Sequence, residues 1–582
     1  MATTTSPKRL FMLTALASFI GLIAGGAAYV LIHLIALLTN LALFHRYSWT
    51  LPSLAHLHAS INLPLVAVAG GLLIGVMAKW APVIKGHGIP EAMEAVLIRQ
   101  SRVSPRTALA KPLSAAIAIG TGGPFGAEGP IIVTGGAIGS LLGQIVDVSA
   151  SERKILLACG AAAGMAATFG APLASVVLAI ELLLFEFSTR AFIPLVVASS
   201  LAAGVHVTAF GSGPLFTVPS HNFAGLDKLP FYVGLGVICG FLAILITKGL
   251  FLVEAGFRKL PINEFWHPAI GALGFALVGL IVPRALGVGY DQISAVLAGK
   301  LALGLLAIVA VAKLIAWWIA LGSGTSGGTL APMLLISGSA GAAIGNLATH
   351  VFPNSHLSPG AFALVAMAAT FGAATRATFT AIVFLFELTR DYHAILPLML
   401  ASVVADLIAA PFLHDSIMTE KLARRGLSVH HEYEVDVMRS KRVRDVMTKD
   451  VQTLPSDATL RDADRLFASK THTAFPLTDP SGNCAGIVTQ QDLLADDASE
   501  ETPLSDLIRH KAPTVAPDDL LVVAVEQFVE EDIDHLPVVD ASGKLVGIVT
   551  KSDVLRARAE RFAHERAEPG WRPLNARKQR AS

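Results

Sequence analysis

The hydrophobic pattern divides the chain near residue 430. Residues 10–44 contain no Asp, Glu, Lys or Arg, and at about 1.5 Å per residue they can cross a hydrocarbon core about 30 Å thick. This stretch is too long for the core of a signal peptide and has no convincing small-residue cleavage site. The pattern predicts a transmembrane helix here, and the preceding Lys8 and Arg9 favour a cytoplasmic N-terminus.

Further apolar stretches follow, uneven in length and interrupted in several places by Gly or Pro. Helix breaks at membrane depth persist only where protein or a water-filled cavity satisfies the freed backbone groups. The pattern therefore favours a transporter or channel over a bundle of uninterrupted helices. The predicted stretches are 63–77, 113–146, 155–180, 191–209, 232–246, 270–282, 301–310, 314–344, 361–374 and 395–413.

Beyond residue 430 the pattern changes to short, half-polar elements. Residues 445–494 and 506–555 repeat at an offset of 61, and each unit contains Gly-Ile-Val-Thr-x-x-Asp. Each unit is predicted to run helix, short strand, Ser-Gly turn, short strand, helix. The sequence therefore predicts a soluble α/β module after the membrane part.

Composition sharpens this division. The whole chain is 53% hydrophobic and 15% charged, with a mean hydropathy of +0.62. Residues 431–582 carry 27 acidic and 20 basic residues, so about 31% are charged, against about 9% in the preceding 430. Three cysteines exclude a disulfide scaffold, and a net charge of +1 gives no sign of nucleic-acid binding. No histidine has a metal-ligand spacing, and we expect neither a metal site nor an enzyme.

The membrane part contains an internal repeat. Met-Ala-Ala-Thr-Phe-Gly at 165–170 recurs at 367–372, an offset of 202. The segments 126–130 and 328–332 align at the same offset, and both repeats continue into apolar runs that end in a Glu. Two motifs that share one offset indicate duplicated halves, and duplicated transporters often hold the substrate at the interface of the halves.

Four short segments are candidates for such a site, at 86–90, 122–130, 322–332 and 413–418. The first three are rich in Gly and end in Pro. Gly lets a ligand approach backbone amides, and Pro is well suited to the first turn of a helix. Several helix N-termini that converge would bind an anion without any fully charged residue. The alternative for each segment taken singly is a helix break or a tight packing point.

In this order the segments resemble those of the CLC family of chloride channels and proton/chloride exchangers, over about residues 10–425. The resemblance implies an all-α polytopic fold of two inverted halves with broken helices, in a homodimer with one anion pathway per subunit. It assigns anion binding to the three glycine segments and to His414. The implied anion-binding residues are Gly86, His87, Gly88, Ile89, Pro90, Gly126, Ala127, Gly129, Gly328, Thr329, Leu330, Ala331 and His414.

Two positions decide the predicted mechanism. Glu128 matches the gating glutamate of the family, and a carboxylate among oriented amides would compete with an anion until it is protonated. The alternative is a helix-start Glu that only complements the dipole. Leu182 stands where exchangers of the family have a second proton-carrying glutamate. This favours a passive channel, while Glu181, Glu186 or a water chain could instead replace the missing acid.

Two histidines and one leucine depart from the family pattern. His87 replaces the usual Ser, His414 replaces a Tyr that contacts the anion, and Leu330 replaces a Phe. A neutral imidazole donates one hydrogen bond, and a protonated one donates two and adds charge. We therefore hypothesise that one or both histidines make anion affinity or conductance depend on pH. The alternative is that each ring is satisfied by nearby backbone.

The repeated tail resembles a pair of CBS motifs, which pack as one module. In such modules a Thr and an Asp can hold an adenosine nucleotide, and the matching residues are Thr489, Asp492, Thr550 and Asp553. The alternative is a helix-capping box, which has the same spacing. Residues 561–582 are basic and are predicted to form a disordered tail.

The sequence as a whole predicts a transmembrane anion-transport domain at 1–430, a linker and first CBS motif at 431–500, and a second CBS motif at 501–560. The predicted function is passive chloride conduction gated by Glu128, and the alternative is proton-coupled antiport. A CBS-regulated divalent-cation transporter is the third class, which the glycine segments disfavour. No cofactor is required. We expect a multi-pass protein of a bacterial inner membrane, with N-terminus and tail cytoplasmic, that binds no nucleic acid.

Overall fold

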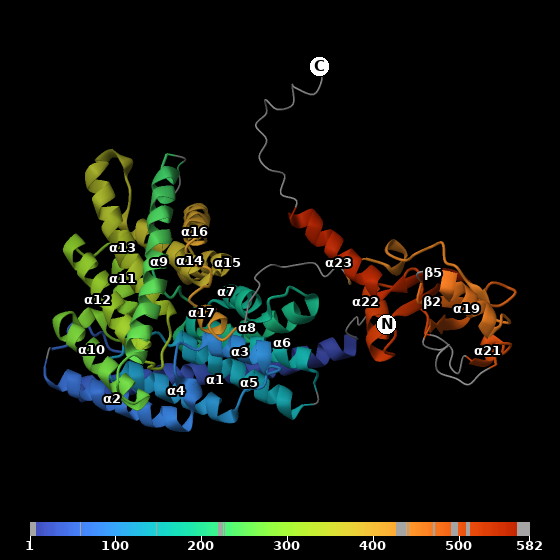
Figure 1. Cartoon of the computed structure of the whole chain (residues 1–582). Helices are drawn as coiled ribbons and strands as arrows, with labels where there is room; N and C mark the ends of the chain where they lie inside the picture. The colour runs from blue at the N-terminus through green and yellow to red at the C-terminus, as the bar shows by residue number, and fades with distance from the viewer. Residues whose placement is uncertain are drawn as a thin grey trace, which may run out of the picture. The chain divides into compact units, whose positions relative to one another are not determined.

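The computed structural model describes residues 7–58, 60–146, 148–218, 225, 227–426, 438, 441–469, 472–490, 499–507 and 513–566. The chain divides into two compact units, Thr5–Tyr433 and a second unit that contains Glu434–Ser582. The first unit runs from blue to yellow in Figure 1, and the second unit is orange to red.

The first unit is built from helices. Among the described residues, eight helices are long and apolar enough to cross a membrane, which confirms the predicted mostly helical multi-span domain. The helices are α1 (Pro7–Phe44), α2 (Asn62–Trp80), α3 (Ile89–Ile98), α4 (Pro105–Gly120), α5 (Glu128–Ile145), α6 (Ala150–Phe169), α7 (Pro172–Ala179), α8 (Thr189–Phe210), α9 (Leu229–Arg258), α10 (His267–Ile281), α11 (Tyr290–Leu297), α12 (Leu303–Gly322), α13 (Leu330–Val351), α14 (Pro359–Thr375), α15 (Thr378–Thr389), α16 (Ile395–Ala409) and α17 (Glu420–Ala423).

The two halves repeat element by element. Helices α4 and α12 end at Gly120 and Gly322, and helices α5 and α13 begin at Glu128 and Leu330, so both pairs keep the offset of 202. The apolar stretches 113–146 and 314–344 are each interrupted in the middle, because a turn rich in Gly separates the two helices. Gly126 pairs with Gly328 in antiparallel orientation, as a twofold relation between the halves requires.

Helices α5 and α6 pack closely through small residues. A Cβ placed on Gly160 would stand 2.0 Å from the carbonyl oxygen of Gly135, and a Cβ on Gly135 would stand equally close to that of Gly160. Gly139 meets the carbonyl oxygen of Leu156 at the same distance. Lipid tails are as apolar as the side chains, so helices in a membrane associate mainly through close packing. Small residues let the helix backbones approach closely. This contact fixes helix α5, whose first residue is Glu128.

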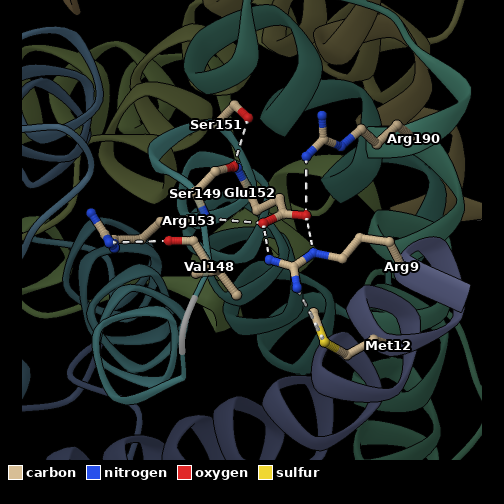
Figure 2. A network of polar contacts seen from close by, with 8 residues as sticks. All are labelled: Arg9, Met12, Val148, Ser149, Ser151, Glu152, Arg153 and Arg190. Carbon is tan, nitrogen blue, oxygen red and sulfur yellow. Dashed lines mark hydrogen bonds and ion pairs between the residues drawn. The ribbon is translucent and has the colours of Figure 1, made fainter. Parts of the chain in front are cut away.

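A polar network joins the starts of three helices (Figure 2). Glu152 on α6 accepts two hydrogen bonds of 2.7 Å from Arg9 on α1 and lies 3.2 Å from Arg190 on α8. The Ser149 side chain caps α6 in a box with Glu152. Nearby, Arg153 donates to the carbonyl oxygens of Val148 and Gln100. The N-terminal ends of α1, α6 and α8 therefore lie together on one side of the unit, which is rich in arginine.

The second unit repeats with an offset of 61, as the sequence predicts. Leu454 pairs in parallel with Leu477, and Val515 pairs in parallel with Val538. The first repeat forms a three-stranded sheet in the order β1-β2-β3, and the second contributes the antiparallel pair β4-β5. The main elements are α19 (Leu460–Ser469), β1 (Leu454–Pro455), β2 (Ala474–Thr478), β3 (Cys484–Thr489), α21 (Leu504–Leu507), α22 (Leu521–Glu530), β4 (His535–Val539), β5 (Leu545–Thr550) and α23 (Lys551–Arg566).

Candidate functional site

The three glycine segments converge at one point in the membrane unit. The Gly126 amide donates to the carbonyl oxygen of Gly328 at 3.3 Å, and the Gly328 amide donates back at 2.8 Å. Gly86 forms a parallel bridge with Ser326. A Cβ on Gly129 would stand 1.8 Å from the carbonyl oxygen of His87, so the first segment packs directly against the second. The structure thus brings together the starts of α3, α5 and α13.

Glu128 lies at the centre of this meeting point. Its side chain is fully buried, and the backbone amides of Glu128 itself and of Ala331 face the carboxylate. A Cβ on Gly126 would stand 1.7 Å from its Oε2 atom, and one on Gly328 would stand 2.6 Å away. Only glycine at these two positions leaves room for the carboxylate. The carboxylate therefore occupies the partly positive end of two helices, the place that suits an anion.

Tyr290, which sequence reasoning missed, holds the Glu128 carboxylate. Its hydroxyl donates to Oε1 at 3.1 Å, while Oε2 has no hydrogen-bond partner in the part of the chain that the structure describes. Tyr290 begins α11, as Ile89 begins α3. Tyr290 is therefore the counterpart of Ile89 in the second half of the membrane unit. At an offset of 201, one residue less than the offset of the other motifs, residues 86, 88 and 89 align with Gly287, Gly289 and Tyr290.

The duplication also supplies a pair of buried lysines. Lys111 and Lys313 are both fully buried and are 202 residues apart. The Lys111 ammonium group donates to the carbonyl oxygens of Ile84 and Gly86, each at 2.8 Å, and the Lys313 group donates to Gly287 at 2.7 Å. Each lysine thus anchors the loop before α3 or α11 and adds positive charge near the site.

His87 is buried beside this point. Its side chain is 1% exposed, and its Nδ1 atom has no hydrogen-bond partner among the described residues. The backbone of Ile417 lies against the ring, and Lys111 and Lys421 are close enough to act on its charge. A buried ring nitrogen without a partner needs a ligand or water to satisfy it.

The N-terminus of α3 already has one acceptor of its own. The Gly88 amide donates to the Glu91 carboxylate at 2.8 Å, in a capping box. An anion that used this amide would have to displace the Glu91 side chain. Of the predicted binding groups, the Gly88 amide is therefore the least available.

The structure does not place His414 with the converging segments. His414 is exposed, whereas Ile417 and Met418, a few residues further along, are buried. The Ile417 amide donates to the carbonyl oxygen of Ala374, which holds this part of the segment against the C-terminal end of α14. The fourth segment therefore reaches the site through Ile417, whose backbone lies against the His87 ring, and an alignment on Asp415 and the residues after it could not reveal this.

The other predicted residues lie in the first turns of these helices. All of them are buried, and their side chains are apolar apart from one threonine, so only backbone amides and one hydroxyl group are available to a ligand. Pro90 suits the start of α3 because the first turn of a helix needs no amide from it. The residues are Ile89, Pro90, Ala127, Thr329, Leu330 and Ala331.

The region around Leu182 has no carboxylate in the expected position. Leu182 is fully buried within a π-helical turn, η2 (Ile180–Leu184). Glu181 is half-buried, and its Oε2 atom accepts from the Thr380 amide at 3.0 Å and from its hydroxyl at 2.5 Å. Glu186 is exposed. π-helical turns often occur at functional sites, and here the turn rotates Glu181 toward α15.

A wide cavity of about 680 Å³ leads to the first glycine segment. Gly86 lines it together with six basic residues, Lys85 and Lys421 among them, and four carboxylates, those of Glu91, Glu94, Glu254 and Glu264. Clefts lined mainly by one sign of charge raise the local concentration of the opposite ion. The basic residues of this cavity only slightly outnumber the acidic ones, so its charge gives at most a small preference for an anion.

In the second unit a cavity of about 560 Å³ lies between the two repeats. Thr550 and Asp553 line it and also form a reciprocal capping box, with 2.7 Å between the hydroxyl and carboxylate oxygens. Burial lowers the pKa of His535 at the same cavity below its usual value. Thr489 ends β3, and Asp492 lies outside the described residues.

Comparison with known proteins agrees with the fold. The sequence profile of the voltage-gated chloride channel family matches residues 69–410, and CBS-domain profiles match 443–498 and 504–560. A putative chloride channel protein ClcB-like of Ralstonia nicotianae is 30% identical over 62% of this chain and 85% of its own. The H(+)/Cl(-) exchange transporter ClcA of Salmonella agona is 32% identical over 63% of this chain and 81% of its own.

Among solved structures, a slow cyanobacterial Cl-/H+ antiporter superposes with a TM-score of 0.64 and 26% identity, over 71% of this chain and 97% of its own. Fold and sequence profile together define an anion-transporting membrane protein with a soluble α/β tail. The chain belongs to the voltage-gated chloride channel (CLC) family, with a C-terminal pair of CBS domains.

Proposed function

We propose that this protein is a proton-coupled chloride antiporter whose protonatable gate is Glu128. The observation that supports this most is the position of the Glu128 carboxylate at the ends of α5 and α13, held by the Tyr290 hydroxyl. A carboxylate and a chloride ion cannot both occupy the same helix ends. Protonation removes the negative charge and frees the place for chloride, so proton binding and chloride binding become linked.

The names of similar proteins favour antiport over a channel. The Salmonella relative is named an exchange transporter and the cyanobacterial structure an antiporter. Our sequence-based interpretation favoured a channel because Leu182 cannot carry a proton. Glu181 offers a carboxylate one residue earlier, bound to Thr380 on a different helix, and we propose that it stands on the internal proton route.

Passive conduction is the second candidate, and Leu182 is the observation that favours it. Full-length protein in vesicles distinguishes the two. With a chloride gradient imposed across the membrane and a pH-sensitive dye inside, an antiporter moves protons against their gradient. A channel passes chloride with no proton movement beyond that of protein-free vesicles, and this result would reject the proposed antiport.

We also propose that the arginine-rich side of the membrane unit faces the cytoplasm. Arg9, Arg153 and Arg190 lie together there (Figure 2), and basic residues are concentrated on the cytoplasmic side of membrane proteins. Family membership further supports a homodimer and a bacterial inner membrane as working assumptions. Protease protection of tagged termini in inverted vesicles checks the orientation.

We propose that His87 is an anion ligand. Replacing His87 by Ala should weaken chloride binding about tenfold, because a hydrogen bond to a charged group contributes about 1.5 kcal/mol or more. Replacing it by Ser should recover part of the affinity, because the hydroxyl can also donate. Chloride binding and flux are measured from pH 5 to 8. Anion selectivity is measured by comparing chloride with nitrate. If neither affinity, selectivity nor pH profile changes, His87 is a structural residue.

We propose that the cavity of the CBS pair binds an adenosine nucleotide at Thr550 and Asp553. Thr550→Ala should weaken nucleotide binding to the full-length protein by about threefold to tenfold, the value of one neutral hydrogen bond. Thr550→Ser keeps the hydroxyl and should bind normally. Equilibrium dialysis with labelled nucleotide measures the affinity.

A matched control separates binding from helix capping. Thr459 and Asp462 form the same kind of box at the start of α19, with 2.8 Å between hydroxyl and carboxylate, and they do not line the cavity. Thr459→Ala should lower stability by about 1 kcal/mol without changing nucleotide binding. Equal binding losses in Thr459→Ala and Thr550→Ala would contradict the proposed nucleotide site.

A further inference from the structure

The membrane unit has a second cavity beside helix α3. It has a volume of about 240 Å³ and is enclosed by α3, α4, α5 and the end of α2. Its inner wall is apolar, with Val133 from α5 and Leu157 from α6. Trp80, which ends α2 and is 55% exposed, stands at its outer edge. A partly exposed tryptophan at a helix end is typical of the membrane–water interface.

The rim of this cavity carries three arginines. Arg99, Arg102 and Arg106 line it, and Glu91 is the one carboxylate among the residues that line it. Glu91 is already engaged with the Gly88 amide. Arg99 forms an ion pair of 2.7 Å with Glu94, and the side chain of Arg106 lies over the Trp80 ring at 5.7 Å.

Two features leave the rim with uncompensated positive charge. Arg102 is exposed and makes no ion pair with any residue that the structure describes. The N-terminus of α4, capped by Ser104, also lies at the rim and adds partial positive charge. A basic rim above an apolar pocket between transmembrane helices has the chemistry that binds the phosphate of a lipid headgroup.

The surroundings point to lipid as the source of that phosphate. Val76 on α2 and Leu109 and Leu113 on α4 are 57%, 66% and 47% exposed, so the helices on either side of the cavity present apolar side chains outward. An acyl chain that lies along these side chains can enter the apolar pocket while its headgroup stays at the arginines. We propose that this cavity is a binding site for an anionic phospholipid of the leaflet that contains the arginine-rich side.

The site is also next to the anion pathway. Glu91, Arg99, Pro82 and Val83 line both this cavity and the wide cavity that leads to Gly86. Helix α3 therefore forms a wall of the lipid cavity and, at its N-terminus, one of the converging helix ends. The inference does not depend on whether the protein exchanges protons, because it concerns lipid binding alone.

Lipid retention by the full-length protein tests the proposal. The protein is reconstituted with phosphatidylcholine and phosphatidylglycerol, extracted, and the lipid that remains bound is counted by native mass spectrometry. We expect the wild type to retain phosphatidylglycerol preferentially. Arg102→Gln and Arg106→Gln should each weaken retention about fivefold, the value of one basic residue near an anionic membrane surface.

Arg46→Gln is the matched control, because Arg46 also lies over an aromatic ring, that of Phe44 at 5.2 Å, and does not line the cavity. Its retention of phosphatidylglycerol should equal that of the wild type. Equal retention of phosphatidylcholine, equal loss in all three variants, or displacement of the bound lipid by inorganic phosphate would each overturn the proposal. Melting temperatures of the variants show that they remain folded.

Discussion

Glu128→Gln should abolish proton movement driven by a chloride gradient while chloride still crosses the membrane. Glutamine has the shape of protonated glutamic acid but carries no exchangeable charge, so the amide does not compete with chloride for the ends of α5 and α13. In vesicles we expect proton uptake to fall to the level without protein and chloride flux to persist at alkaline pH, where the wild type slows. The dye assay and chloride efflux are measured on the same vesicles.

A second variant separates the effect of losing the carboxylate from an effect on local packing. Glu128→Asp serves as the comparison, because it keeps the charge on a side chain shorter by one methylene and should retain pH-dependent chloride flux. If Glu128→Gln still moves protons at the wild-type rate, another group carries them, and Glu128 is only a dipole-complementing residue. Loss of chloride flux in Glu128→Gln would also contradict the gate.

Gly160→Ala should destabilise the membrane unit by about 3 kcal/mol or more. The new Cβ would stand 2.0 Å from the carbonyl oxygen of Gly135, far inside contact distance, and backbone atoms cannot move aside as flexible side chains do. Overpacking in a well-filled core costs about 1–3 kcal/mol and sometimes more. We expect a clearly lower melting temperature in detergent and a lower yield of dispersed protein.

Gly234→Ala is the control for this change. Gly234 lies in helix α9, is exposed, and would place its Cβ with nothing within 4 Å. Alanine is favoured over glycine in a helix by up to about 1 kcal/mol, so stability should be equal or slightly higher. If both alanine variants have the melting temperature of the wild type, the close contact of α5 and α6 does not limit stability.

Much of the fold could be predicted because duplication is visible in the sequence. The offset of 61 predicts every main element of the CBS repeats, and the offset of 202 predicts where α5 and α13 begin. The glycine segments also converge as expected, since glycine permits close approach of backbones and proline suits the first turn of a helix. Channel or antiport could not be decided in this way, because Leu182 removes one acid and says nothing about its substitutes.

Other parts of the site depend on contacts that no local pattern encodes. Tyr290 reaches Glu128 across 162 residues, and its segment has Tyr where the first half has Ile89, so the motif is not repeated letter by letter. His414 was assigned from the residues after it, yet a chain that turns at the end of a helix can place neighbours on opposite sides. Here it exposes His414 and buries Ile417.

The position of the Glu128 carboxylate has a consequence for how chloride competes. A ligand group that is tethered beside its own site has a high effective concentration, of millimolar order even on flexible linkers and higher on a single side chain. In the gate that we propose, and at equal intrinsic affinity, free chloride must exceed this local concentration to displace an ionised Glu128. The proposed gate therefore implies that a change in chloride level alone is a weak signal, whereas a change in the supply of protons, which removes the tethered competitor, is a strong one.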